Sequence, residues 1–284
     1  MASINDLKHQ LEESDSLKLV TDALGDLAAL EIQRTRAEVL QNTQFFNEIA
    51  EVYHDVRVVS AKHRLLHKLP AHTPKNGRTV AVLLTSNEGF FGGLDYRITQ
   101  QFVDTAKKFP CEQIVVGKFG VKYLASTHYS LPYTQILFDR DTPTPEELHN
   151  LVNKTIEYSK VLLFHAKFVT TLHQEPEISD ISSAEETPES LESKIDYIIE
   201  PEIDKMLVFF ENQLLTLLYK AIFLQSQLSK TAARMVSMYE AGLNVEKQIA
   251  AEKRELTKAS RQRQNVLILE TYAGIRNLLS YRKE

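Results

Sequence analysis

The final segment of the chain, residues 201–284, constrains the fold more than any other stretch. After Pro201 there is no further proline, and Gly242 and Gly274 are the only glycines. Apolar residues recur in steps of three and four, which places one narrow apolar stripe on one face of a helix. They are Leu207, Phe210, Leu214, Leu217, Ala221, Leu224, Leu228, Met235, Met238, Val245, Ile249, Leu256, Leu267, Tyr272, Ile275 and Leu279.

A helix of about 75 residues would be on the order of 110 Å long, because each residue adds about 1.5 Å. No globular domain of this size is that wide, so we expect the helix to need a partner along its length. Arginine and lysine residues occur throughout the segment, which excludes a membrane span.

The N-terminal segment predicts a second long helix, of roughly 60 residues. Residues 4–68 contain no proline and only Gly25 as a glycine. Between Asp6 and Arg64 there are eleven Asp and Glu against seven Lys and Arg, whereas residues 230–284 hold eleven Lys and Arg against six Glu. Opposite charge balances favour an antiparallel pair of helices. Two independently solvated faces are the alternative, since surface ion pairs contribute only about 0–1 kcal/mol each.

The character of the chain changes after residues 70–78, which contain two prolines and an Asn-Gly pair. Short apolar runs then alternate with helical spacing, as in an open sheet with helices on its faces. We expect strands at 80–84, 114–116, 136–138, 161–171 and 197–199, helices at 95–108, from 121 and at 145–160, and an exposed acidic loop at 174–193. The expected fold class is therefore α/β plus long α: an antiparallel coiled coil of two terminal helices, 1–69 and 201–284, with an inserted α/β domain at 78–200.

Composition excludes several classes of function. The formal charge of −5 and pI near 6.0 give no support to nucleic-acid binding. Cys111 is the only cysteine, so neither a disulfide framework nor a cysteine zinc site is expected. The first residues show no secretion signal, and we expect the protein in the cytosol or on the cytosolic side of a membrane.

The chain shows no catalytic constellation and no pattern that predicts a cofactor. The glycine-rich segment 88–93 follows a strand, as a dinucleotide loop does, but G-x-G-x-x-G and the P-loop pattern are both absent. A tight turn with positive φ is the better interpretation. His63 and His67 are spaced to hold a metal from one helix face, yet no third ligand lies near them, which favours a solvated face.

The segments LVTDAL at 19–24, LTSNEGFFGGL at 84–94, IIEP at 198–201 and AARMVSM at 232–238 lie in order along nearly the whole chain, and together they resemble the γ subunit of F-type ATP synthase. The most specific is residues 232–238, AARMVSM, which is similar to the family's AARMVAM. The resemblance implies a coiled coil inserted in an α3β3 hexamer and a Rossmann-like α/β domain near the ε subunit and the c-ring of Fo.

The resemblance also implies a function. The family's γ subunit catalyses nothing itself; as the central rotor shaft of F1 it transmits torque between the ion-driven membrane ring and the catalytic β subunits. We therefore expect no cofactor, no nucleic-acid partner and a peripheral location on the cytoplasmic face of the inner or plasma membrane, held there by the complex.

Rotor–stator contacts carry over from the resemblance only at matching positions. The family's arginine in A-R-M-V corresponds to Arg234, its R-Q pair to Arg263 and Gln264, and its following glutamate to Glu270. An ordinary helix-face ion pair is the alternative for each.

Residues 24–31 depart from the family, whose segment there is basic and faces acidic loops of β. Leu24 and Asp26 are the contact candidates in it, while Gly25 and Glu31 replace two usual lysines, and Asp22 replaces another before the segment. We expect extra Lys or Arg in the facing loop of the partner. Two other functions stay open: a γ-like subunit of a specialised F-type ATPase not coupled to protons, and a nucleotide-binding enzyme built on 78–200.

Overall fold

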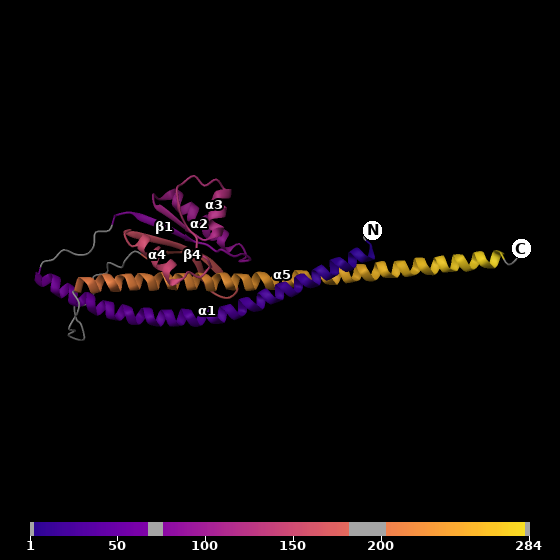
Figure 1. Ribbon diagram of the computed structural model, residues 1–284, viewed down its shortest axis with the longest axis horizontal. Coiled ribbons are helices and arrows are strands. Elements are labelled where there is room, and N and C mark those ends of the chain that lie inside the picture. The colour runs from indigo at the N-terminus through magenta and orange to yellow at the C-terminus, as the bar shows by residue number, and fades with distance from the viewer. Residues whose placement is uncertain (1–2, 68–75, 182–202, 282–284) are drawn as a thin grey trace. The chain divides into compact units, whose positions relative to one another are not determined.

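The computed structural model describes residues 3–67, 76–181 and 203–281. A long helix stands at each end of the described chain: α1, Ile4–His67, has 64 residues and α5, Ile203–Tyr281, has 79 (Figure 1). Both predicted terminal helices are thereby confirmed. Among the described residues, no helix combines the length and the apolarity that crossing a bilayer demands.

The described middle of the chain forms one five-stranded sheet with the order β3-β2-β1-β4-β5. The first four strands are parallel, and β5 runs antiparallel to β4. The strands are β1 Thr79–Leu84, β2 Glu112–Val116, β3 Thr134–Ile136, β4 Lys160–Phe168 and β5 Gln174–Asp180. The connecting helices are α2 Leu94–Lys108, α3 Lys118–Ser126 and α4 Pro145–Thr155.

Strand β5 corrects the first part of the exposed loop predicted at 174–193, over residues 174–180, while residues 182–193 lie outside the described residues. Its sequence, QEPEISD, is polar because the strand lies at an edge of the sheet. The outer side of an edge strand pairs with no further strand, so the missing backbone N–H of Pro176 is tolerated there. Two carboxylates of β5 form ion pairs with lysines of β4. Lys167 Nζ lies 2.6 Å from Glu177 Oε1, and Lys160 Nζ lies 3.3 Å from Asp180 Oδ2. The prediction read a charged edge strand as a loop.

Element boundaries differ from the predictions by a few residues. The third strand is Thr134–Ile136 rather than 136–138, and α4 ends at Thr155 rather than 160, since Lys160 already belongs to β4. The N-terminus of α4 is fixed by a reciprocal cap in which the Thr144 hydroxyl accepts from Glu147 N. The strand predicted at 197–199 lies outside the described residues.

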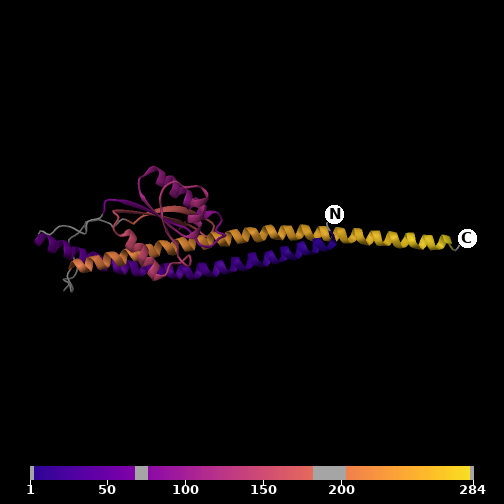
Figure 2. The same ribbon diagram turned by 45° about the horizontal axis from the view of Figure 1, so that its top comes forward.

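Each face of the sheet has its own apolar core. Val80, Val82 and Leu84 point to one side of β1, where side chains of α4 and α5 cover them. Ala81 and Leu83 point to the other side, where α2 and α3 pack. Both views show α2 and α3 on one face of the sheet and α5 on the other (Figure 1, Figure 2). A sheet covered on both faces explains why β1 is apolar from Val80 to its end.

The chain divides into two compact units, and both long helices contribute to each. Unit 1 consists of Met1–Leu27 and Met235–Glu284, and unit 2 of Ala28–Arg234. Within unit 1 the helices run antiparallel, since Ser14 contacts Glu252 and Lys18 contacts Glu246. Within unit 2 they also run antiparallel, because Glu31 bonds Gln227 and Asn42 bonds the carbonyl of Leu217. The predicted antiparallel pairing is confirmed within each unit.

Candidate functional site

The loop after β1 occupies the position where nucleotide-binding folds hold phosphate, and here it caps a neighbouring helix. The first free amides of α3 donate to this loop: Lys118 N to Asn87 Oδ1 at 3.0 Å, Phe119 N to the Ser86 carbonyl at 3.0 Å, and Gly120 N to Thr85 Oγ1 at 2.9 Å. Unsatisfied amides at a helix N-terminus are what binds an anion. In this helix the chain's own oxygen atoms satisfy them.

The glycine at the start of α3 makes that cap possible. Gly117 has a φ of 97°, and a Cβ added there would lie 2.3 Å from the Thr85 carbonyl oxygen. The close approach is therefore between two backbone segments of this chain. The expected tight turn in 88–93 is also confirmed, since Phe90, Gly92 and Gly93 have φ values of 70°, 57° and 75°.

Arg234 is enclosed by groups of its own unit. Its Nη2 lies 2.5 Å from Glu88 Oε2, and its Nη1 lies 3.9 Å from Glu31 Oε2. Its guanidinium lies over the ring of Phe91, 4.6 Å from the centroid, and its side chain is only 16% exposed. Arg234 thus holds the loop after β1 against both long helices of unit 2.

A cavity of about 380 Å³ lies beside Arg234, between the end of β1, residues 140–142 and α5. Its lining contains as many carboxylates as cations, with Glu31, Glu88 and Asp141 against Arg140, Lys230 and Arg234. Lys230 Nζ lies 3.6 Å from Asp95 Oδ1, and burial raises the pKa of Asp141, although the amide of Asn87 donates to it. This charge balance does not favour an anionic nucleotide.

Leu24 and Asp26 lie on α1 in unit 1. Leu24 is half-buried and Asp26 is exposed. Gly25, between them, faces α5. A Cβ added at Gly25 would lie 3.9 Å from Met238 Cβ, its nearest neighbour. A Cβ at this distance would make an ordinary van der Waals contact, so the packing does not explain the departure from the family's lysine.

A charged cluster on the same part of α1 was missed by the sequence reasoning. Lys18 Nζ lies 2.7 Å from Asp22 Oδ1 and 3.0 Å from Glu246 Oε1, and hydrogen bonds to these carboxylates raise its pKa. Gly242 makes room for the cluster, because its added Cβ would lie 3.2 Å from Lys18 Nζ. The i, i+4 spacing of Lys18 and Asp22 was the available signal; the partner on α5 was not visible in the sequence.

Arg263, Gln264 and Glu270 lie on α5 in unit 1 and are all exposed. Arg263 and Glu270 are seven residues apart and so lie on one face, about two turns from each other. Neither forms an ion pair with any described residue. The structure thus places these three residues on one exposed stretch of α5, with Arg263 and Glu270 on a shared face, whereas it places Arg234 in unit 2.

Between these residues, the helix is apolar on all sides over the single turn 266–269, and this turn is exposed. Every side chain from 261 to 275 is exposed. The exposed fractions from Val266 through Leu269 lie between 52% and 68%, and four consecutive residues span a full turn. Tyr272 and Ile275 continue the surface. A helix that is apolar all round is normally buried, so this segment has the character of one that a partner encloses.

The described residues contain no group of three or more His, Cys, Asp or Glu side chains that could hold a metal ion. His63 and His67 lie in α1, but their side chains are outside the part of the chain that is described. The metal site weighed for this pair stays untested.

Comparison with known proteins gives one family. The family model described as ATP synthase matches residues 3–270. The ATP synthase gamma chain of Clostridium beijerinckii is 24% identical over 256 residues, which cover 86% of this chain and 87% of that protein. The ATP synthase gamma chain of Herpetosiphon aurantiacus is 26% identical over 273 residues, covering 86% and 88%.

Solved structures show the same fold at lower identity. A chain of the Euglena gracilis mitochondrial ATP synthase rotor aligns with a TM-score of 0.60 at 14% identity, covering 91% of this chain and 98% of that one. A chain of the Tetrahymena thermophila mitochondrial ATP synthase central stalk and c-ring aligns with a TM-score of 0.58 at 18% identity, covering 78% and 99%.

Proposed function

The chain belongs to the ATP synthase γ-chain family, and from this premise we propose that it is the central rotor shaft of an F1 motor that catalyses no reaction itself. The proposed partners are the ring of three α and three β subunits, the ε subunit and the c-ring of Fo. The proposed location is the cytoplasmic face of the membrane, held peripherally through the complex.

One observation carries the proposal: the uncovered segment 261–275 of α5. Within it, the exposed apolar side chains of residues 266–269 surround the helix, which suits a partner that encloses it rather than one that contacts a single face. Within this segment, Arg263, Gln264 and Glu270 supply polar groups. Neither Arg263 nor Glu270 forms an ion pair with a described residue. We propose that they contact the ring.

The mechanical role follows from asymmetry. An antiparallel pair of helices presents different side chains in each direction around its axis, so a ring of three identical catalytic subunits meets three different surfaces. Rotation of the shaft then imposes a different conformation on each β subunit in turn. Differential contacts with each subunit are what allow a shaft to shift the populations of their conformations.

The alternative of a nucleotide-dependent enzyme has little support from the geometry. The first amides of α3, at the same edge of the sheet, are bonded to residues 85–87, and the neighbouring cavity is lined by equal numbers of carboxylates and cations. Calorimetric titration of the full chain with ATP, ADP and NAD tests it, and micromolar binding would favour the enzyme.

The alternative of a specialised ATPase that is not coupled to protons is suggested by the acidic residues Asp22, Asp26 and Glu31. Two of these have partners within the chain: Asp22 pairs with Lys18, and Glu31 lies near Arg234 and accepts from Gln227. Asp26 remains as an exposed carboxylate for a basic partner loop. The acidic substitutions are therefore explained largely by packing within the chain, which weakens this alternative.

The test is reconstitution of the full chain with the α and β subunits from the same source. We expect a stable complex whose ATP hydrolysis turns a bead attached to the chain. Arg263→Ala with Glu270→Ala should reduce the torque, whereas the matched exposed pair Lys107→Ala with Lys108→Ala should not. Purification of the chain in a complex without α- or β-type subunits would refute the proposal.

A further inference from the structure

Residues 228–233 of α5, which we call the enclosed stretch, are buried without a break. Six consecutive residues cover more than one full helical turn, so neighbouring elements of unit 2 surround the helix here. Most of the enclosed stretch is small and uncharged, with the sequence LSKTAA. Lys230 is its only charged residue.

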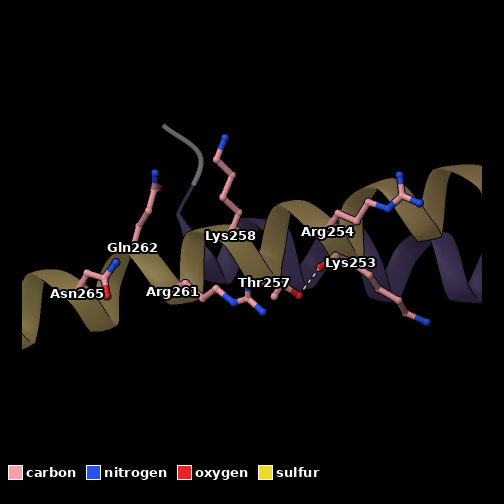
Figure 3. A pocket seen from close by; sticks show the side chains of 7 residues that line it. All are labelled: Lys253, Arg254, Thr257, Lys258, Arg261, Gln262 and Asn265. Atoms are coloured by element: carbon pink, nitrogen blue, oxygen red, sulfur yellow. Dashed lines mark hydrogen bonds between the residues drawn. The ribbon is translucent and has the colours of Figure 1, made fainter.

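The burial of Lys230 separates it from the cations further along α5. Figure 3 shows four of these, which are exposed and extend away from the helix: Lys253, Arg254, Lys258 and Arg261. In contrast, the side chain of Lys230 is only 9% exposed, and that of its partner Asp95 is 5% exposed. Removing two charged groups from water costs free energy. A buried pair at this place therefore calls for a physical explanation.

The pair joins α5 to the first turn of α2. Lys230 Nζ lies 3.6 Å from Asp95 Oδ1, an oxygen that accepts no hydrogen bond from a described residue. The two helices lie on opposite faces of the sheet (Figure 1). Tyr219 and Phe223 of α5 pack in the core on one face, whereas Ala233 belongs to the core on the α2 side. At the enclosed stretch, α5 therefore reaches past the sheet to α2.

The contribution of this pair is directional. A buried ion pair adds little net stability, because the cost of desolvation offsets most of the attraction. Apolar contacts are non-directional, and a helix that presents small side chains has a smooth surface. An ion pair between two fixed side chains favours one rotation of α5 about its axis. Arg234, one turn further along, bonds Glu88. Two ion pairs on one side of α5 thus hold the connection between β1 and α2.

We propose that the Lys230–Asp95 pair fixes the rotation of α5 relative to the α/β domain, so that torque passes between them at a defined angle. Both are positioning residues. This inference rests on the proposed function, in which the domain meets the c-ring and α5, one helix as far as Tyr281, enters the ring of α and β. Asp141 and the buried His165 also act on Lys230 electrostatically, but the ion pair that Lys230 forms within the described chain is with Asp95.

The test measures torsional stiffness in the reconstituted complex, with the α and β subunits fixed to a surface and nucleotide absent. A bead is attached at one of two exposed positions, Lys108→Cys at the end of α2 or Gln213→Cys on α5, each combined with Cys111→Ser. The thermal variance of the bead angle falls as the stiffness between bead and ring rises. The contact between α2 and α5 contributes to the variance at position 108 and not to that at position 213.

Lys230→Met removes the charge and keeps a long, unbranched side chain. We expect the variance at position 108 to rise about twofold, because one of the two ion pairs is lost, and the variance at position 213 to stay unchanged. Lys220→Met is the matched control, since Lys220 is an exposed lysine of α5 in unit 2. The control should equal the wild type at both positions. A wild-type variance at position 108 in Lys230→Met would overturn the proposal.

A second variant separates positioning from a merely structural role. Lys230→Met leaves Asp95 buried without its partner and should lower Tm by about 10 °C. Lys230→Met combined with Asp95→Asn removes both charges and should regain most of that loss. We expect the variance of this double variant at position 108 to remain about twofold high, because the directional contact is still absent. Recovery of both Tm and the wild-type variance would overturn the proposal. The double variant carries the test if Lys230→Met does not fold.

The outcomes distinguish the two proposals. If the wild type forms no complex with the α and β subunits, the proposed function fails and this inference is overturned with it. If the wild type assembles and rotates while both variants keep its angular variance, the proposed function stands and the positioning role of Lys230 and Asp95 alone is overturned.

Discussion

Arg234→Ala is expected to destabilise the isolated chain, before any partner is added. The guanidinium bonds Glu88, lies near Glu31 and stacks on Phe91, so it joins the loop after β1 to both long helices of unit 2. The resemblance to the family assigns this arginine to contact with the ring. The structure gives it a second role inside its own subunit, and the two roles predict different results for the free chain.

The size of the effect follows from three contributions. The pair with Glu88, which is 63% exposed, contributes about 0.2–1 kcal/mol. Cation–π stacking on Phe91 contributes about 0.5–1 kcal/mol, and the aliphatic part of a side chain that is only 16% exposed adds a similar amount by burial. Together these give about 2 kcal/mol, which lowers Tm by about 4–8 °C for a unit of this size.

The assay is thermal unfolding of the isolated chain, followed by circular dichroism. Arg140→Ala is the matched control, since Arg140 lines the same cavity, is exposed and has no ion pair among the described residues. A double-mutant cycle with Glu88→Ala should give a coupling energy of about 0.5 kcal/mol or more. An unchanged Tm for Arg234→Ala, or strict additivity in the cycle, would show that the intramolecular contact contributes nothing.

Three further substitutions test other parts of unit 2. Gly117→Ala should lower stability by about 3 kcal/mol or prevent soluble expression, because the new Cβ meets the Thr85 carbonyl at a positive φ; a soluble variant with wild-type Tm would contradict this. Tyr219→Phe removes the buried hydroxyl that donates to Thr155 at 2.7 Å and should cost about 1 kcal/mol, or about 2–4 °C in Tm. Burial raises the pKa of Asp141, so the folded state holds its proton more tightly than the unfolded state; the ionised form lowers stability at neutral pH, and the penalty disappears as pH falls below about 3.9. Asp141→Asn should therefore raise Tm by about 1–3 °C at pH 7 and not at pH 3, whereas a decrease at pH 7 would refute the sign.

Periodicity was enough to predict both long helices and the mostly parallel sheet. A helix in which apolar residues recur every three or four positions has one face that must be covered. Strand β1 is apolar from Val80 onward because both faces of the sheet are buried there. The ends of the elements and the edge strand β5 were harder to predict from the sequence. The residues of an exposed edge strand show no alternation of apolar and polar side chains that would reveal it.

The roles of single polar residues depended on the tertiary structure. Lys18, Glu31 and Arg234 are unremarkable on a helix, and each has a partner on a distant segment of the chain. The role of Gly242 likewise depends on the helix that packs against it. Whether a side chain is buried can be predicted from its neighbours along the chain, because burial repeats with the period of the helix or strand. An ion pair or a cap requires two particular atoms to come within about 3 Å, and only the packing of remote segments decides that.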